Sequence, residues 1–218
     1  DLGDLVGVDG RLGYSKTGEL TVFASGLTFL TKSIETPPDK FHGLVDTELK
    51  QRMRYVDLIH GEGVRERFIA RSRIVASIRD TLARRGYLEV EGPTLQDSAG
   101  GAAARPFKTH HNALDMALVL RIALELHLKR LLVGGLERVF ELGRVYRNEG
   151  VSPRHNPEFT MLEAYEAYGD YVTMMDLTEA IIRDAAKVAG TPPVVQWMGH
   201  EVDLAKPFER VRYDDLLA

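Results

Sequence analysis

The stretch from Arg144 to Tyr171 reads RVYRNEGVSPRHNPEFTMLEAYEAYGDY. It contains most of two runs of strand-forming residues, 138–149 and 158–168, which are joined by the eight residues GVSPRHNP. A connection this short between neighbouring strands predicts an antiparallel pair. The pair would form the centre of the fold, and most of the chain's chemically interesting side chains lie on it.

Side chains alternate between the two faces of a strand, so residues two apart share a face. Arg147 and Glu149 share one face of the first strand, and Phe159, Glu163 and Tyr165 share one face of the second. If these faces coincide, one surface carries a guanidinium, two carboxylates, a phenol and an aromatic ring. Such a surface suits a ligand with a phosphate, an amine and a planar ring, because arginine forks onto phosphate and rings stack on phenylalanine.

A simpler interpretation fits the same spacing. A hairpin with one face in water commonly carries arginine and glutamate as cross-strand pairs. The spacing of the residues leaves both interpretations open.

The composition narrows the class of protein. The chain has 218 residues, of which 44% are hydrophobic and 28% charged, as expected for a globular domain with a core, alone or with a small neighbour. A net charge of −4 gives no overall basic field for nucleic acid, although local binding stays open. The absence of cysteine excludes disulfides, thiolate metal sites and a cysteine nucleophile. No apolar run reaches about 18 residues and the first residues lack a basic signal region, so we expect a cytoplasmic protein without membrane segments.

Two regions are expected along the chain. Residues 4–34 alternate as three short strands around a turn at 16–19, with Gly18 at positive φ. The region 1–36 is therefore predicted to be part of a small barrel with too few strands to close. Residues 37–43 begin with two prolines and are predicted to form a linker. The second region, 44–218, mixes strands with helical patterns and predicts an α+β fold built on an antiparallel sheet.

Helical periodicity in the second region is found at 64–85, 122–133 and 172–188. Gly86, the pair Gly134–Gly135 and Gly190 are expected to end these helices, and Asp170 is expected to cap the last one.

Four segments resemble a known family. RVYRNEGVSPRHNPEFTMLEAYEAYGDY resembles motif 2 of the class II aminoacyl-tRNA synthetases, in its lysyl-tRNA synthetase form. GGAAARPFKTHHNALDM (100–116) resembles a second lysyl signature, and PDKFHGLVDTELKQRMRYVDLI (38–59) resembles the segment between the family's domains. RRGYLEVEGPTL (84–95) resembles motif 1, the dimer-interface motif, which ends in a proline. The resemblance covers nearly the whole chain.

The resemblance implies a fold and an activity. Residues 44–218 would be a class II catalytic domain, an antiparallel sheet flanked by helices, and residues 1–36 would be part of an OB-fold anticodon-binding barrel. The activity would be ATP-dependent activation of lysine to lysyl-adenylate and its transfer to tRNA(Lys) by a homodimer. Mg²⁺ would be held by ATP phosphates and by carboxylates beyond this chain, so no metal ligand is expected within it.

The resemblance also implies roles for single residues. Arg147 would be the catalytic residue, holding the ATP α-phosphate and the lysine carboxylate, and Pro93 would lie in the dimer interface. The other ATP-binding residues would be Glu149, Arg154, His155 and Phe159. The lysine-binding residues would be Gly101, Glu125, Arg147, Glu163 and Tyr165, with Tyr165 hydrogen-bonded to the ε-ammonium.

The chain departs from the family pattern in three places. The glycine-rich motif 3 is not found after Trp197, so we expect a lysyl-tRNA synthetase cut at both ends, with weak or no activity by itself. Leu124 replaces a usual proline, which relaxes the constraint on φ at the expected helix start, and His127 replaces a usual tyrosine. Two alternatives stay open, namely a paralogue that modifies elongation factor P and a non-catalytic fragment that binds a partner or dimerises.

Overall fold

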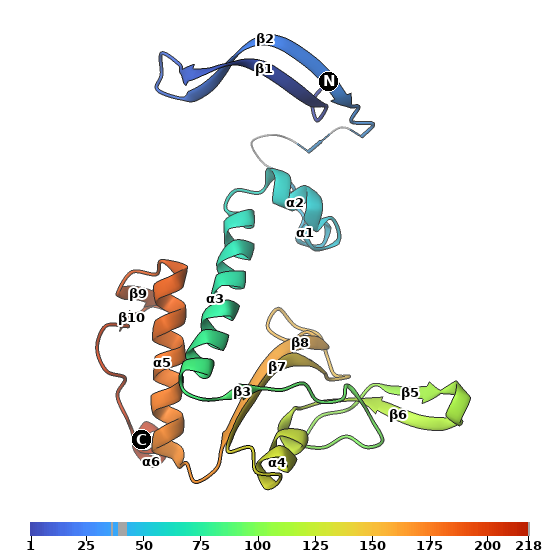
Figure 1. Ribbon diagram of the computed structural model, residues 1–218, viewed down its shortest axis with the longest axis vertical. Helices are drawn as coiled ribbons and strands as arrows, with labels where there is room; N and C mark the ends of the chain where they lie inside the picture. Colours follow the sequence, from blue (N-terminus) through green and yellow to red (C-terminus); the bar gives the residue numbers. More distant parts are fainter. Residues whose placement is uncertain (36, 39–42, 218) are drawn as a thin grey trace. The chain divides into compact units, whose positions relative to one another are not determined.

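The computed structural model describes residues 1–35, 37–38 and 43–217, and the chain divides into two compact units, Asp1–Ile69 and Ala70–Ala218 (Figure 1). The elements of the first unit are β1 (Leu5–Tyr14), β2 (Leu20–Thr31), α1 (Thr47–Arg52), α2 (Arg54–His60) and the start of α3 (Val64–Arg84). The predicted linker falls largely on residues that are not described, and the predicted domain boundaries stay predictions.

The strands β1 and β2 form one antiparallel hairpin, paired from Leu5 with Thr31 to Tyr14 with Leu20. The prediction of three short strands was wrong. Residues 15–19 form the turn itself, because the Ser15 N–H donates to the Glu19 carbonyl and the Gly18 N–H donates to the Ser15 carbonyl. The φ of Gly18 is 83°, as the turn prediction required. Two strands form no closed barrel in the described residues, so the OB-type barrel stays a prediction.

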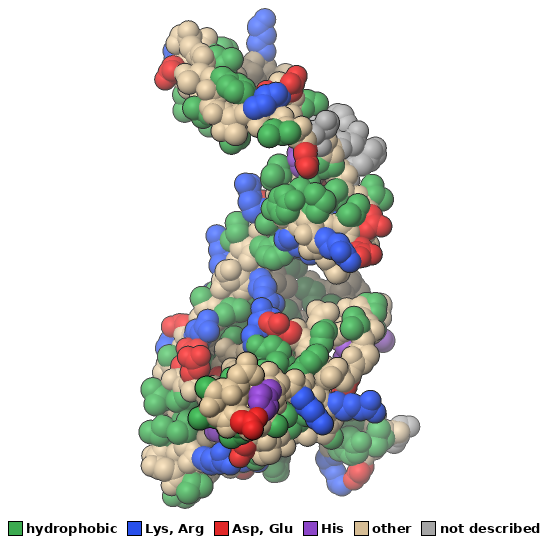
Figure 2. Space-filling view, turned by 90° about the vertical axis from the view of Figure 1, so that its right-hand side faces the viewer, with side chains coloured by type: hydrophobic (Ala, Val, Ile, Leu, Met, Phe, Trp, Pro, Cys, Tyr) green, Lys and Arg blue, Asp and Glu red, His purple; other side chains and the backbone are tan. Residues whose placement is uncertain are grey.

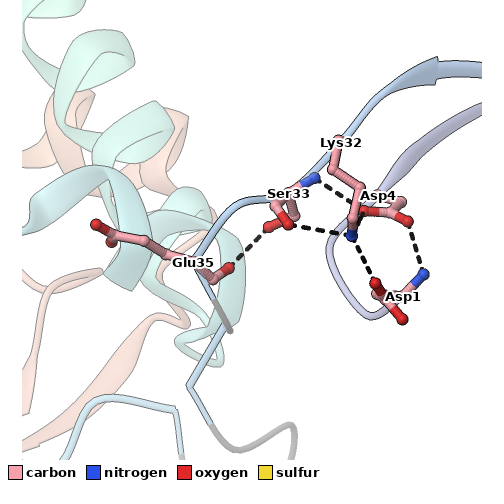
Figure 3. Close-up of polar contacts among 5 residues, drawn as sticks. All are labelled: Asp1, Asp4, Lys32, Ser33 and Glu35. Atoms are coloured by element: carbon pink, nitrogen blue, oxygen red, sulfur yellow. Dashed lines mark hydrogen bonds and ion pairs between the residues drawn. The ribbon is translucent and has the colours of Figure 1, made fainter.

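At the open end of the hairpin, ion pairs connect the residues before β1 to Lys32, which follows β2 (Figure 3). The Lys32 ammonium lies 2.7 Å from the carboxylate of Asp1 and 2.8 Å from that of Asp4, which also accepts the Ser33 N–H. The hydrogen bond from Lys32, followed by that from the N-terminal ammonium, lowers the pKa of Asp4 below its usual range. Elsewhere the hairpin exposes many apolar side chains, among them Leu27 and Phe29. Figure 2 shows apolar side chains, in green, on the surface of this part of the molecule.

The second unit contains two three-stranded sheets. In the first, β7 (Arg138–Tyr146) lies between β3 (Leu88–Glu89), which is parallel to it, and β8 (Glu158–Glu166), which is antiparallel. In the second, β6 (Met116–Leu120) lies between β4 (Leu95–Gln96) and β5 (Lys108–His111), both antiparallel to it. The other elements are η1 (Asn112–Leu114), α4 (Glu125–Val133), α5 (Tyr171–Ala189), β9 (Val194–Trp197), β10 (His200–Asp203) and α6 (Tyr213–Leu217).

The central hairpin β7–β8 has a core on each face because its side chains alternate. On one face Phe140, 1% exposed, packs with Leu82 of α3 and Leu177 of α5, and Figure 1 shows these two helices side by side. On the other face Val139 packs with Leu128 of α4. The expected α+β architecture with an antiparallel sheet flanked by helices is confirmed for this unit. Over the described residues, no helix combines the length and apolarity that crossing a membrane requires.

All three predicted helix ends follow their local signals, and α4 ends at Val133, directly before the pair Gly134–Gly135. The φ of Gly86 is 82° just after α3, and the φ of Gly190 is 71° just after α5. Asp170 caps α5 by accepting the Thr173 N–H at 3.0 Å.

The prediction that a helix begins at 122 was wrong, since α4 begins at Glu125. The buried residues 122–124 bond to the sheet instead. The Ile122 carbonyl accepts Nε of Arg147 at 3.4 Å, and the Leu124 N–H donates to the Glu163 carboxylate at 3.0 Å. The predicted strands were also too long, because β7 ends at Tyr146 and β8 at Glu166.

A partly exposed polar cluster joins the end of β8 to the segment after α3. The hydroxyl of Tyr87 donates to Glu166 at 2.7 Å, and Nε of Arg138 donates to the same carboxylate at 2.7 Å. These two partners, Tyr87 first, hold the pKa of Glu166 below its ordinary value. A carboxylate with a lowered folded pKa stabilises the fold above its unfolded pKa, and this contribution is lost as the pH falls through the folded pKa.

We therefore expect Glu166→Gln to lower the free energy of unfolding at pH 7 by about 1–2 kcal/mol. The difference from the wild type should begin to shrink at about pH 4, where the carboxylate of the unfolded chain takes up a proton, and should be lost as the pH falls through the lowered folded pKa of Glu166. Urea unfolding at pH 7 and at acid pH measures both effects. Glu158→Gln is the matched control, because Glu158 lies on the same strand with a 54% exposed side chain. Equal losses in the two variants would contradict the prediction.

Candidate nucleotide and amino-acid site

The register of β7 and β8 decides whether the face that carries Arg147 and the face that carries Phe159, Glu163 and Tyr165 form one surface, which is called the site face below. Val145 pairs with Phe159 and Glu141 pairs with Glu163, and the Arg147 N–H continues the ladder by donating to the Pro157 carbonyl at 2.8 Å. Directly paired residues share a face, so the expectation that the two faces coincide is confirmed. The Arg147 guanidinium carbon lies 5.3 Å from the centroid of the Phe159 ring. A cation and an aromatic plane are thus held together on one face of the sheet.

A cavity of about 210 Å³ opens beside this pair. It is smaller than the roughly 300–1,000 Å³ usual for whole ligands, so it matches a part of a nucleotide. All five residues predicted to bind ATP contribute to its lining, which consists of Arg147, Glu149, Gly150, Arg154, His155, Asn156 and Phe159.

The turn between β7 and β8 positions the cationic part of this lining. Ser152 and His155 exchange two backbone hydrogen bonds of 3.1 Å, and the Ser152 hydroxyl lies 2.8 Å from Nδ1 of His155. The same hydroxyl accepts the Arg154 N–H at 3.2 Å. Glu149 accepts the Arg105 N–H at 3.3 Å. The turn thus holds a guanidinium and an imidazole at the cavity, where they can meet anionic oxygens.

The predicted amine-binding residues form a second group on the same sheet face. One oxygen of Glu163 accepts the Leu124 N–H at 3.0 Å and the other accepts the Tyr165 hydroxyl at 2.8 Å. Burial, and then the Glu163 carboxylate, raises the pKa of Tyr165, so its phenol is neutral at pH 7. The carboxylate keeps lone pairs for a further donor.

Gly101 and Glu125 lie together beside this group. The φ of Gly101 is 84°, and a Cβ at this position would lie 3.0 Å from Cβ of Glu125 and 3.1 Å from Cβ of Ala123. Glycine therefore lets the loop backbone approach the start of α4 closely. The structure brings each predicted lysine-binding residue to this side of the sheet, and their roles in binding remain predictions.

Comparison with known proteins places the chain in a family. The family model described as tRNA synthetases class II (D, K and N) matches residues 46–218. The chain belongs to this family. It is 60% identical over 210 residues to a lysine–tRNA ligase of Chromobacterium violaceum and 58% identical over 216 residues to one of Enterococcus faecalis. These matches cover 96% and 99% of the chain, and the chain spans 42% and 43% of the length of the relatives.

Sequence reasoning missed one pair of residues in this class II synthetase chain. Arg121 and Glu141, both buried, form an ion pair of 2.6 Å. Arg121 also donates to the carbonyls of Arg144 and Gly92, and the Gly92 N–H donates to Glu141. Glu141 shares strand parity with Arg147, a signal that could have placed it on the site face. Glu141 lies directly opposite Glu163 on the two strands. Because Arg121 neutralises Glu141, this carboxylate does not repel that of Glu163.

Pro93 does not line the cavity beside Arg147 and Phe159. It lines a separate cavity of about 220 Å³ with His127 and Arg130 of α4. Its place in a dimer interface of the synthetase remains a prediction.

Proposed function

We propose that this chain supplies the ATP and lysine sites of a lysine–tRNA ligase, which forms lysyl-adenylate and transfers lysine to tRNA(Lys). The observation that carries the proposal is the single sheet face on which the Arg147–Phe159 pair lies over a cavity and the Glu163–Tyr165 pair lies further along β8. One end of that face suits a phosphate and a flat ring, and the other suits an ammonium. The names of the relatives support lysine and tRNA as the substrates.

The adenylation step follows from this arrangement. Phe159 would stack on the adenine, and Arg154 and His155 would contact the outer phosphates. A lysine carboxylate oxygen would attack the α-phosphorus while the bond to pyrophosphate breaks. The Arg147 guanidinium would bridge the carboxylate and the α-phosphate and offset the charge that develops there, so catalysis would rest on positioning and electrostatics.

The amine end would hold the substrate in register. A partly desolvated ammonium needs paired negative charge and hydrogen-bond acceptors. Glu125 and Glu163, with the backbone of Gly101, would receive the α-ammonium of lysine. The neutral Tyr165 hydroxyl would accept a hydrogen bond from the ε-ammonium.

The cavity lining does not fit a Mg²⁺ site made by these residues. Glu149 is the one carboxylate among them, it already accepts a backbone N–H, and the remaining charged groups are cationic or become so on protonation. We propose that Mg²⁺ enters with the ATP phosphates. A homodimer through Pro93 and a cytoplasmic location are further parts of the proposal.

Lysine is expected to stabilise the chain against heat. At a free concentration 100 times its dissociation constant, it should raise the melting temperature by about 5–10 °C, because a ligand of the folded state shifts unfolding by mass action. Differential scanning fluorimetry measures the shift. Norleucine, which lacks the ε-ammonium, is the control and should give a smaller shift. Absence of a lysine shift at tens of millimolar, or an equal shift with norleucine, would contradict the proposed site.

A further inference from the structure

One ammonium of the chain itself lies at the proposed amine site. Lys129 is one helical turn after Glu125 on α4, and its Nζ lies 2.5 Å from the Glu125 carboxylate. The same Nζ lies 5.7 Å from the centroid of the Tyr165 ring on β8. Lys129 therefore contacts two of the residues that would bind lysine.

This contact differs from the usual pair of Glu and Lys four residues apart on a helix. Such pairs commonly lie in solvent and bridge two residues of one helix. Here the ammonium also lies over a ring from the sheet, and the hydroxyl of that ring donates to Glu163. The Lys129 ammonium is thus held between α4 and the site face of β8.

The exposed fractions of the Glu125 and Lys129 side chains would allow the ammonium of a lysine ligand to replace that of Lys129 at the Glu125 carboxylate. The Glu125 side chain is 29% exposed, so without a cation it would lose part of its hydration and gain no partner. The Lys129 side chain is 54% exposed, so its flexible stem can turn the ammonium into water at small cost. Two ammonium groups at one carboxylate repel each other, so a ligand amine and Lys129 compete.

We propose that the Lys129 ammonium occupies the Glu125 side of the amine pocket until the lysine substrate displaces it. The inference rests on the proposed function, because it takes Glu125 and Tyr165 as lysine-binding residues. By competing, Lys129 keeps the affinity for lysine below the value that the two carboxylates alone would give, and it keeps Glu125 paired in the empty site.

The test measures lysine binding to the 218-residue chain by isothermal titration calorimetry. Lys129→Gln removes the charge and keeps a polar side chain, and it is expected to lower the dissociation constant for lysine by about threefold. Lys129→Arg keeps the charge and should bind lysine as the wild type does. Arg130→Gln removes one positive charge from the next position of the same helix and should leave the dissociation constant unchanged.

The salt dependence of the dissociation constant for lysine distinguishes competition by Lys129 from a purely structural role of this residue. The advantage of Lys129→Gln over the wild type should shrink as NaCl rises from 0.05 M to 0.5 M, because the competition is between exposed charges. An unchanged or larger dissociation constant in Lys129→Gln, or an equal gain in Arg130→Gln, would overturn the proposal while leaving the lysine site in place. If neither the wild type nor Lys129→Gln binds lysine, the proposed function fails as well.

Discussion

Replacing Arg147 by alanine is expected to lower lysine-dependent ATP–pyrophosphate exchange by about 10²–10³-fold. The Arg147 guanidinium lies on the site face, where its Nε donates to the Ile122 carbonyl and its carbon lies 5.3 Å from the centroid of the Phe159 ring. Alanine would leave the charge that develops at the α-phosphate without its preorganised donor. The assay uses a polypeptide of the relatives' full length that contains this chain.

Two further variants separate the role of Arg147 from general effects. Arg144→Ala removes an exposed arginine from the opposite face of the same strand, and it should leave exchange near the wild-type rate. Arg147→Lys keeps the charge without the two-pronged donor geometry, so its rate should lie between those of the wild type and Arg147→Ala. Near-normal exchange in a folded Arg147→Ala protein would remove Arg147 from the proposed chemistry.

Replacing Phe140 by alanine is expected to be the most destabilising single change considered, at about 3–5 kcal/mol. The Phe140 side chain is 1% exposed and packs between Leu82, Tyr87 and Leu177, so its loss leaves a cavity where α3 and α5 meet the sheet. The free energy of unfolding of a domain is commonly only about 5–15 kcal/mol, so this loss would remove a large part of it and raise the unfolded fraction. Urea unfolding followed by circular dichroism measures the loss.

The control for Phe140→Ala lies on the neighbouring strand. Leu88→Ala shortens a β3 side chain that is 52% exposed, and it should cost less than about 1 kcal/mol. A loss below about 1 kcal/mol in Phe140→Ala would show that β7 is not packed as described.

Much of the fold could be predicted because its signals are local. The turn at Gly18, the cap at Asp170 and the helix ends before Gly86 and Gly190 depend on the φ and hydrogen bonds of a few neighbouring residues. The central hairpin followed from strand parity and a short connection. The error at 122–124 has the opposite origin, because those residues have a helical pattern of apolar residues but bond to Arg147 and Glu163, which are distant in the chain.

The candidate site likewise has features that follow from local sequence signals and features that depend on the tertiary structure. The sequence alone determined that 159, 163 and 165 share a strand face and that motifs of a class II synthetase run through the chain. It predicted a strand reaching 149, whereas β7 ends at Tyr146 and residues 147 and 149 follow it. Tertiary structure decided that Arg147 shares the face of 159, 163 and 165, that Arg121 neutralises Glu141, and that the Lys129 ammonium lies over Tyr165. The physical reason is that parity and turns depend on adjacent residues, whereas register and ion pairing depend on how segments far apart in the chain pack together.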